Sequence, residues 1–151
     1  MIRVSYNGGR GYADVVLNST GDGLDAERDH GFETAVLLSL YTDRRVEASE
    51  VPKGASRGGW WGATFPKRAG DIEGSRYWLL FAYGGVASDE NRRRSEEYST
   101  EALAWLIEDG LAAEISPTAS VIASDLIGVS IRFLLTTGQT VFIQAEVPIA
   151  V

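Results

Sequence analysis

Residues 31–62 read GFETAVLLSLYTDRRVEASEVPKGASRGGWWG, and this stretch decides how the rest of the chain is arranged. Its first part, residues 32–41, is apolar on almost every side of a 3.6-residue turn, which predicts a helix that is buried by its neighbours. The apolar pattern stops at the charged residues 43–45. The paired Trp60 and Trp61 follow among three glycines. We therefore expect a central helix followed by an ordered aromatic loop.

Length and composition fit one globular domain. The chain has 151 residues, of which 44% are apolar and 23% are charged, and roughly 100–200 residues per domain is usual. The longest apolar run, residues 35–40, falls far short of the ~20 residues that span a bilayer. The N-terminal residues lack the features of a secretory signal. We expect no membrane segment and a protein that stays where it is made.

Charge and cysteine content restrict the possible ligands. The chain has no cysteine, which excludes disulfides and thiolate metal sites. Its net charge is -7, whereas affinity for nucleic acid comes mostly from Lys and Arg side chains that neutralise phosphates. Nucleic acid is therefore not an expected partner.

The N-terminal part, residues 1–24, is predicted to contain a β-hairpin over residues 2–17. Two alternating segments there flank turn residues that tolerate positive φ. Asp29 or a neighbour can cap the central helix, and Glu33 suits the positive end of its dipole. Arg44 and Arg45 suit the other end, although an inter-subunit salt bridge is an equally good interpretation.

Residues 47–74 form a long connection without sustained periodicity. Connections above ~12–15 residues usually bind something or are disordered, and Trp60, Trp61 and Phe65 indicate order. Two interpretations stay open. The aromatic side chains cover the central helix, or they fill a partner's pocket, as tryptophan often does at interface hot spots.

The second half predicts helices followed by strands. A short helix is expected after Gly74. A longer amphipathic one is expected over residues 89–109, with Arg92–Glu96 and Arg93–Glu97 pairs, and Gly110 as its stop. Four alternating segments then predict the strands of an antiparallel meander within residues 111–151, namely 111–115, 119–122, 126–135 and 140–147. The helical part, 31–110, must bury its apolar stripes on that meander. The prediction is a single two-layer α+β domain.

The sequence contains few of the residues and motifs that catalytic sites need. His30 is the only histidine, and no G-x-S-x-G elbow presents a serine nucleophile. A pair of carboxylates is the only catalytic arrangement that the composition permits. Glycoside hydrolysis needs two carboxylates ~5–9.5 Å apart. The candidates are Asp43, Glu47, Glu50, Glu108 and Asp109. We expect no catalytic, cofactor-binding or metal-binding residues.

Four blocks in order, GFETAVLLSLYTDRR, GGWWG, GSRYWLL and EEYSTEALAWLIEDGLA, resemble the tail protein family of phage Mu and its relatives. That family is related to the wedge protein of the T-even phage baseplate that nucleates the contractile sheath. The resemblance covers nearly the whole chain. Where the broader family carries Glu-Pro-Arg, this chain reads Glu108-Asp109-Gly110, so a contact made by that arginine is not carried over.

The resemblance implies a structural wedge component of a contractile tail baseplate, present in six copies and located in the virion tail after assembly in the bacterial host cytoplasm. Its implied partners are other wedge proteins, the tail sheath and tube-proximal proteins, and an exposed edge of the meander is expected to pair with an extended arm of a neighbour. The residues expected to contact partners are Arg44, Arg45, Trp60, Trp61, Phe65, Leu126, Val129, Val141 and Ile143. The alternative is a carboxylate-dependent, lysozyme-like cell-wall hydrolase, because some relatives have been labelled so.

Overall fold

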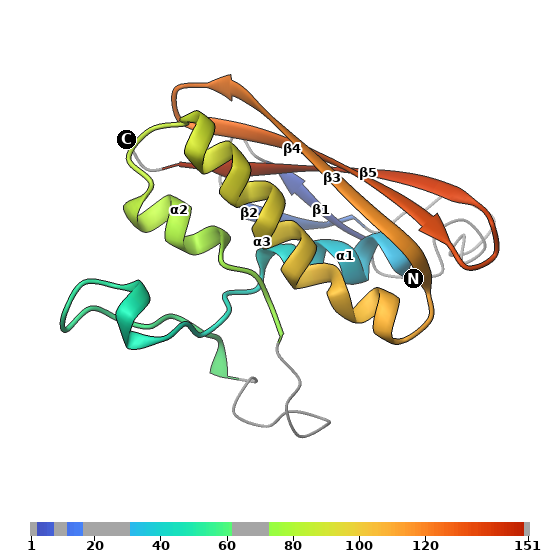
Figure 1. Cartoon of the computed structure of the whole chain (residues 1–151), viewed down its shortest axis with the longest axis horizontal. Helices are drawn as coiled ribbons and strands as arrows, with labels where there is room; N and C mark the ends of the chain where they lie inside the picture. The colour runs from blue at the N-terminus through green and yellow to red at the C-terminus, as the bar shows by residue number, and fades with distance from the viewer. Residues whose placement is uncertain (1–2, 8–11, 17–30, 62–72, 150–151) are drawn as a thin grey trace.

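A computed structural model describes residues 3–7, 12–16, 31–61 and 73–149. The elements, in chain order, are β1 (Arg3–Asn7), β2 (Tyr12–Val16), α1 (Phe32–Tyr41), the 3-10 turn η1 (Ala48–Glu50), α2 (Tyr77–Tyr83), α3 (Asp89–Glu108), β3 (Ala112–Ala123), β4 (Leu126–Leu135) and β5 (Thr140–Pro148). Figure 1 shows the helices gathered on one face of the sheet formed by β3, β4 and β5. The expected two-layer α+β arrangement is confirmed.

The sheet is antiparallel throughout and has the order β3-β4-β5, so β4 is its central strand. On β4, alternate side chains point into the core. Ile127, Val129, Ile131 and Phe133 are all fully buried. In the register, Val129 lies opposite Ala119 on β3 and Ala145 on β5. The strict alternation along β4 explains why sequence periodicity located this strand.

One sequence prediction for the sheet was wrong, because the segments expected as separate strands over 111–115 and 119–122 are one strand, β3. The strand runs through Pro117, which a central strand would not tolerate because proline has no N–H to donate to the ladder. β3 is an edge strand, and Pro117 lies opposite Ile131 without a break in register. Its missing donor therefore costs no ladder hydrogen bond.

Helix α3 begins and ends where the sequence predicts. The Ser88 hydroxyl accepts a hydrogen bond from the Asn91 N–H at 3.2 Å and caps the first turn, and Gly110 with φ +73° follows the last one. The predicted Arg92–Glu96 pair is present at 3.0 Å. Arg93, however, pairs with Asp89 at 2.9 Å instead of with Glu97. Asp89 lies one turn earlier on the same face of the helix, where the positive end of the dipole also favours its carboxylate.

Helix α1 packs against α3 and the sheet, but it is not buried on all sides. Val36, Leu37 and Leu40 are buried, whereas Leu38 is 52% exposed, so the expectation of burial all round was wrong for one face. Ser39 links the two helices, because its hydroxyl accepts a hydrogen bond from the Trp105 indole N–H at 3.0 Å.

The C-terminal end of α1 differs from the expected arrangement, and the residues expected to cap its other end lie largely outside the described part of the chain. Its N-cap residue is Gly31, without a side-chain cap, and Asp29 lies outside the described residues. The helix ends at Tyr41, and its last turn contains no basic residue. Arg44 and Arg45 therefore follow the helix and do not complement its dipole from the last turn.

A seam of buried polar side chains joins α2 to α3. The Tyr77 hydroxyl lies 2.5 Å from the Ser99 hydroxyl, and burial raises the pKa of Tyr77, so the tyrosine stays protonated. The Asn91 amide donates to the carbonyl oxygens of Gly84 and Val86, both at 2.8 Å. These hydrogen bonds give partners to two backbone carbonyl groups just after α2 and hold the end of α2 on α3.

The backbones of β1 and β2 pair in antiparallel fashion, with Arg3 opposite Val16, beside α1. The residues expected to form the hairpin turn after Asn7 lie outside the described part of the chain. No helix in the described part is long and apolar enough to cross a bilayer.

Candidate partner interface

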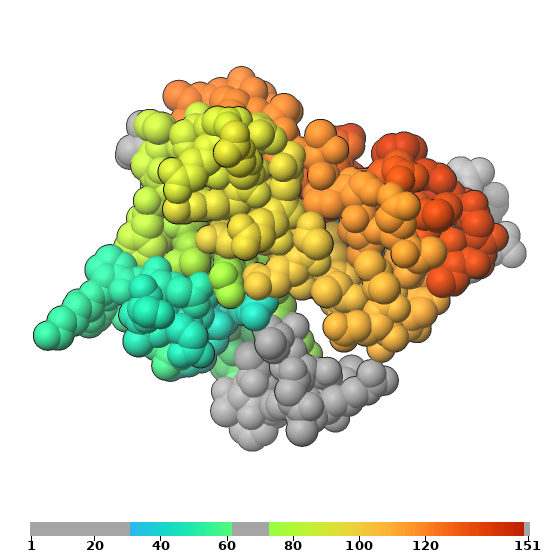
Figure 2. Space-filling model, viewed as in Figure 1, coloured from blue at the N-terminus to red at the C-terminus, as the bar shows by residue number. Residues whose placement is uncertain are grey.

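Residues 44–61, which we call the arm, are anchored at their start on the chain that leads into α2. The Arg44 N–H donates to the Ser75 carbonyl at 3.0 Å, and the Ser75 N–H donates to the Thr42 carbonyl at 2.9 Å. The Trp78 indole N–H donates to the Arg44 carbonyl at 2.8 Å. Figure 2 shows the arm protruding from the rest of the surface.

The arm has internal hydrogen bonds that fold it into a defined turn. The Val46 N–H donates to the Arg57 carbonyl at 3.0 Å, and the Arg57 Nε donates to the Val46 carbonyl at 2.7 Å. Glu47 and Glu50 form a capping box around η1. Both the base and the interior of the arm are hydrogen-bonded. The arm therefore holds its last residues, Trp60 and Trp61, in a fixed position.

The aromatic residues at the end of the arm face solvent. Trp60 is 39% exposed and Trp61 is 80% exposed, and their rings meet edge to face with centroids 5.6 Å apart. Gly58 is the arm residue that meets the body here, because a Cβ at this position would lie 2.4 Å from the Trp78 ring. Trp78 thus packs beneath the arm while Trp60 and Trp61 stay accessible.

A carboxylate on α3 holds the two ends of the segment that contains the arm. Glu101 pairs with Arg44 at 3.1 Å and with Arg76 at 3.3 Å. Arg76 also pairs with Glu50 of η1 at 3.0 Å and lies over the Tyr98 ring, with the guanidinium carbon 5.8 Å from the centroid. These charges form a network rather than an isolated surface pair, which favours a fixed arm orientation.

The outer edge of β5 is closed at one end, and its other end has no hydrogen-bond partner among the described residues. The Tyr41 hydroxyl donates to the Glu146 carbonyl at 2.8 Å and accepts from the Glu146 N–H at 2.9 Å, so both groups of Glu146 point away from β4. Alternation along an antiparallel strand turns the same groups of Thr140, Phe142 and Gln144 outward. No described residue forms a hydrogen bond with those outward groups. Pro148, the next outward-facing residue after Glu146, has no N–H to offer a partner strand.

The outer edge of β3 is closed near its middle. The Glu96 carboxylate of α3 accepts a hydrogen bond from the Ala119 N–H at 2.8 Å. Pro117, two residues earlier, removes the neighbouring outward donor. The register also shifts near both ends of β3. These features are ways in which proteins protect edge strands. Among the described residues, β5 therefore carries the edge with unpaired outward groups.

Comparison with known proteins adds a family to this geometry. The family described as "Phage protein GP46" matches residues 32–140, from the start of α1 to the start of β5. The chain belongs to this GP46 family. It is 33% identical over 122 residues to "Baseplate protein gp46" of Escherichia phage Mu, covering 80% of this chain and 81% of that protein. It is 29% identical over 130 residues to "Mu-like prophage FluMu protein gp46" of Haemophilus influenzae, covering 86% and 84%.

The structure separates the contact residues expected for this GP46 protein into three groups. Arg45, Trp60 and Trp61 are exposed on the arm. Val129 and Ile143 are buried in the core, so no partner can reach their side chains. The others are Arg44, held by Glu101, partly buried Leu126 and Val141, and Phe65, which lies outside the described residues.

Sequence reasoning missed the residues that close the sheet edges. Tyr41 and Glu96 are far in sequence from the strands they protect, and nothing in their local pattern signals the role. Pro117 was a usable signal, because proline within an alternating segment indicates an edge strand. Glu101 likewise gave no local sign that it would hold the arm.

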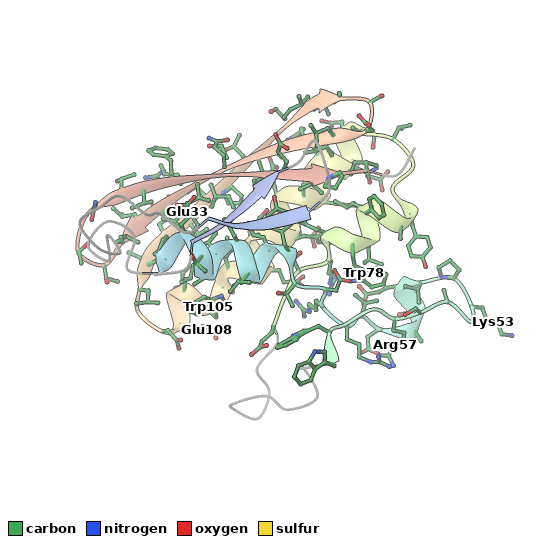
Figure 3. The ribbon with its side chains drawn as sticks, turned by 180° about the vertical axis from the view of Figure 1, so that it is seen from behind. Glu33, Lys53, Arg57, Trp78, Trp105 and Glu108 are labelled. Carbon is green, nitrogen blue, oxygen red and sulfur yellow. The ribbon has the colours of Figure 1, made fainter. Side chains whose placement is uncertain are left out.

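The candidate carboxylates of the GP46 protein do not gather into one site. Glu47 pairs with Arg57 at 3.2 Å, while Glu50 caps η1 and pairs with Arg76. Figure 3 shows Glu108 at the end of α3, apart from Arg57 on the arm. Partial desolvation raises the pKa of the Asp43 carboxyl. Among the described residues, no three His, Cys, Asp or Glu side chains could together hold a metal ion, and His30 lies outside them.

Proposed function

We propose that this chain is a structural wedge component of a contractile tail baseplate and that it helps to initiate the tail sheath. The baseplate part rests on membership of the GP46 family and on the name of the phage Mu relative. The finer role is supported by one observation, the outer edge of β5, whose Thr140, Phe142 and Gln144 groups have no hydrogen-bond partner among the described residues. We place the protein in the virion tail, in six copies, after assembly in the host cytoplasm with other wedge, sheath and tube-proximal proteins.

Strand addition on β5 gives this role a physical mechanism. An extended segment of the sheath protein pairs with the outward N–H and C=O groups of Thr140, Phe142 and Gln144, and the main-chain hydrogen bonds supply affinity. Phe142 is 64% exposed in the middle of this stretch and offers an apolar contact to the added strand. Tyr41 and Pro148 end the pairing, so the docked segment has a defined length and register.

The arm supplies a second contact in the proposed wedge. Exposed Trp60 and Trp61 are suited to fill a pocket on another protein, because tryptophan is enriched at interface hot spots. No observation favours the cell-wall hydrolase alternative. The described carboxylates on the arm are bound to arginines, and Glu108 belongs to a different element, the last turn of α3.

Proline at Gln144 tests the edge. The change removes an outward N–H and places a ring where a partner strand must approach, while the hydrogen bonds between β5 and β4 remain. We expect capture of the co-expressed sheath protein in a pulldown to fall at least about tenfold, equivalent to losing one or two main-chain hydrogen bonds.

The matched control is Gln144→Ala, which removes the 3.0 Å side-chain bond to Ser130 but keeps the backbone N–H. It should capture sheath protein as the wild type does. Thermal unfolding establishes that both variants are folded, and Phe142→Pro provides a second edge variant. Equal capture by the proline and alanine variants would show that β5 is not the docking edge.

A further inference from the structure

The C-terminal end of α3, residues 107–111, is an exposed surface that combines apolar side chains with negative charge. Ile107 is 48% exposed and Leu111 is 47% exposed. Glu108 lies between them, and the last turn of α3 contains no basic residue. A carboxylate at this end of a helix adds to the negative end of the helix dipole. We call residues 107–111 the α3 end.

The arm has the opposite character. Its basic residues outnumber its acidic ones, although the whole chain has a net charge of -7. The basic residues are Arg44, Arg45, Lys53 and Arg57, and the acidic ones are Glu47 and Glu50. Of the basic ones, Arg45 and Lys53 are exposed. The arm therefore presents two tryptophans and accessible positive charge on an otherwise acidic protein.

We propose that the arm of one copy docks on the α3 end of a second copy. Trp60 and Trp61 pack on Ile107 and Leu111, and Arg45 approaches Glu108 and the negative end of the helix. A second copy is the occupant because one chain carries both halves of the contact, matched in charge and both rich in exposed apolar side chains.

The two surfaces are different parts of the molecule. The arm precedes α2, whereas the α3 end lies at the end of α3 and the start of the connection to β3. A contact between unlike surfaces is head-to-tail, and repetition of such a contact gives a closed ring or an open chain of subunits. The proposal goes beyond the sheath-initiating role and does not depend on it, because the purified chain alone contains everything the contact needs.

Sedimentation velocity at low salt tests the proposal with two variants. The arm variant carries Trp60→Ala and Trp61→Ala, and the end variant carries Ile107→Ser and Leu111→Ser. We expect the wild-type sedimentation coefficient to rise with protein concentration, while each variant alone stays monomeric. An equal mixture of the two variants retains one intact arm and one intact α3 end, so it should form a dimer that grows no further.

A charge exchange provides an independent readout. Arg45→Glu and Glu108→Arg should each weaken association, and a chain with both changes should regain it. Leu38→Ser is the matched control, because Leu38 is an exposed aliphatic residue on α1, outside both surfaces. A wild-type chain that stays monomeric at every concentration would overturn the proposal. So would association that survives in both variants.

Discussion

Replacement of Phe133 by alanine lowers the free energy of unfolding by about 3–5 kcal/mol, the range for deleting a buried phenylalanine. Phe133 is fully buried on the central strand β4 and is among the largest side chains in the core. Its ring meets Phe32 of α1 edge to face, with centroids 5.1 Å apart. The substitution removes this contact and leaves a cavity where the sheet meets α1.

Urea unfolding followed by circular dichroism measures the change. Phe142→Ala is the matched control, because it deletes the same side chain from the exposed face of the neighbouring strand. We expect that control to cost less than about 0.5 kcal/mol, as surface substitutions usually do. Similar losses for the two variants would mean that the sheet does not have the buried face described here.

Alanine at Gly74 lowers the free energy of unfolding by about 3 kcal/mol. Gly74 has φ +89°, which costs a residue with a Cβ roughly 1–3 kcal/mol. The added Cβ would also lie 2.4 Å from the Thr42 carbonyl oxygen, a backbone atom that cannot move without disturbing the base of the arm. Strain and clash therefore act together at the point where the arm segment rejoins the body.

Gly54→Ala separates these two effects. Gly54 has a similar φ of +83°, but a Cβ there would meet no atom within 4 Å. It therefore carries only the backbone strain, and we expect a cost of about 1 kcal/mol. Thermal unfolding of the two variants gives the comparison. If Gly74→Ala loses no more stability than Gly54→Ala, the base of the arm is not packed as closely as described.

Local signals predicted the elements in which several rules agree. For α3, an amphipathic pattern and a terminal glycine both indicate the same helix, and the structure places it at Asp89–Glu108. For β4, strict alternation identifies both the strand and its buried face. The α+β class follows, because these elements can bury their apolar faces only against each other.

Features that depend on contacts between distant residues could not be predicted. Tyr41 closes part of the β5 edge from a helix 105 positions away in sequence. Glu101 fixes the arm by pairing with Arg44 and Arg76, and its sequence position on α3 marks it only as a surface acid. Val129 and Ile143 were expected to contact partners because they lie in the last strands, but alternation turns them inward.

Amide hydrogen exchange, resolved by residue with and without bound sheath protein, tests the central claim most directly. The account predicts that the amides of Phe142 and Gln144 exchange quickly in the free protein and become protected when the sheath segment adds to β5. The Ala119 amide on β3 already has a partner and should not change. Unchanged exchange at Phe142 and Gln144 in a complex that contains sheath protein would contradict strand addition.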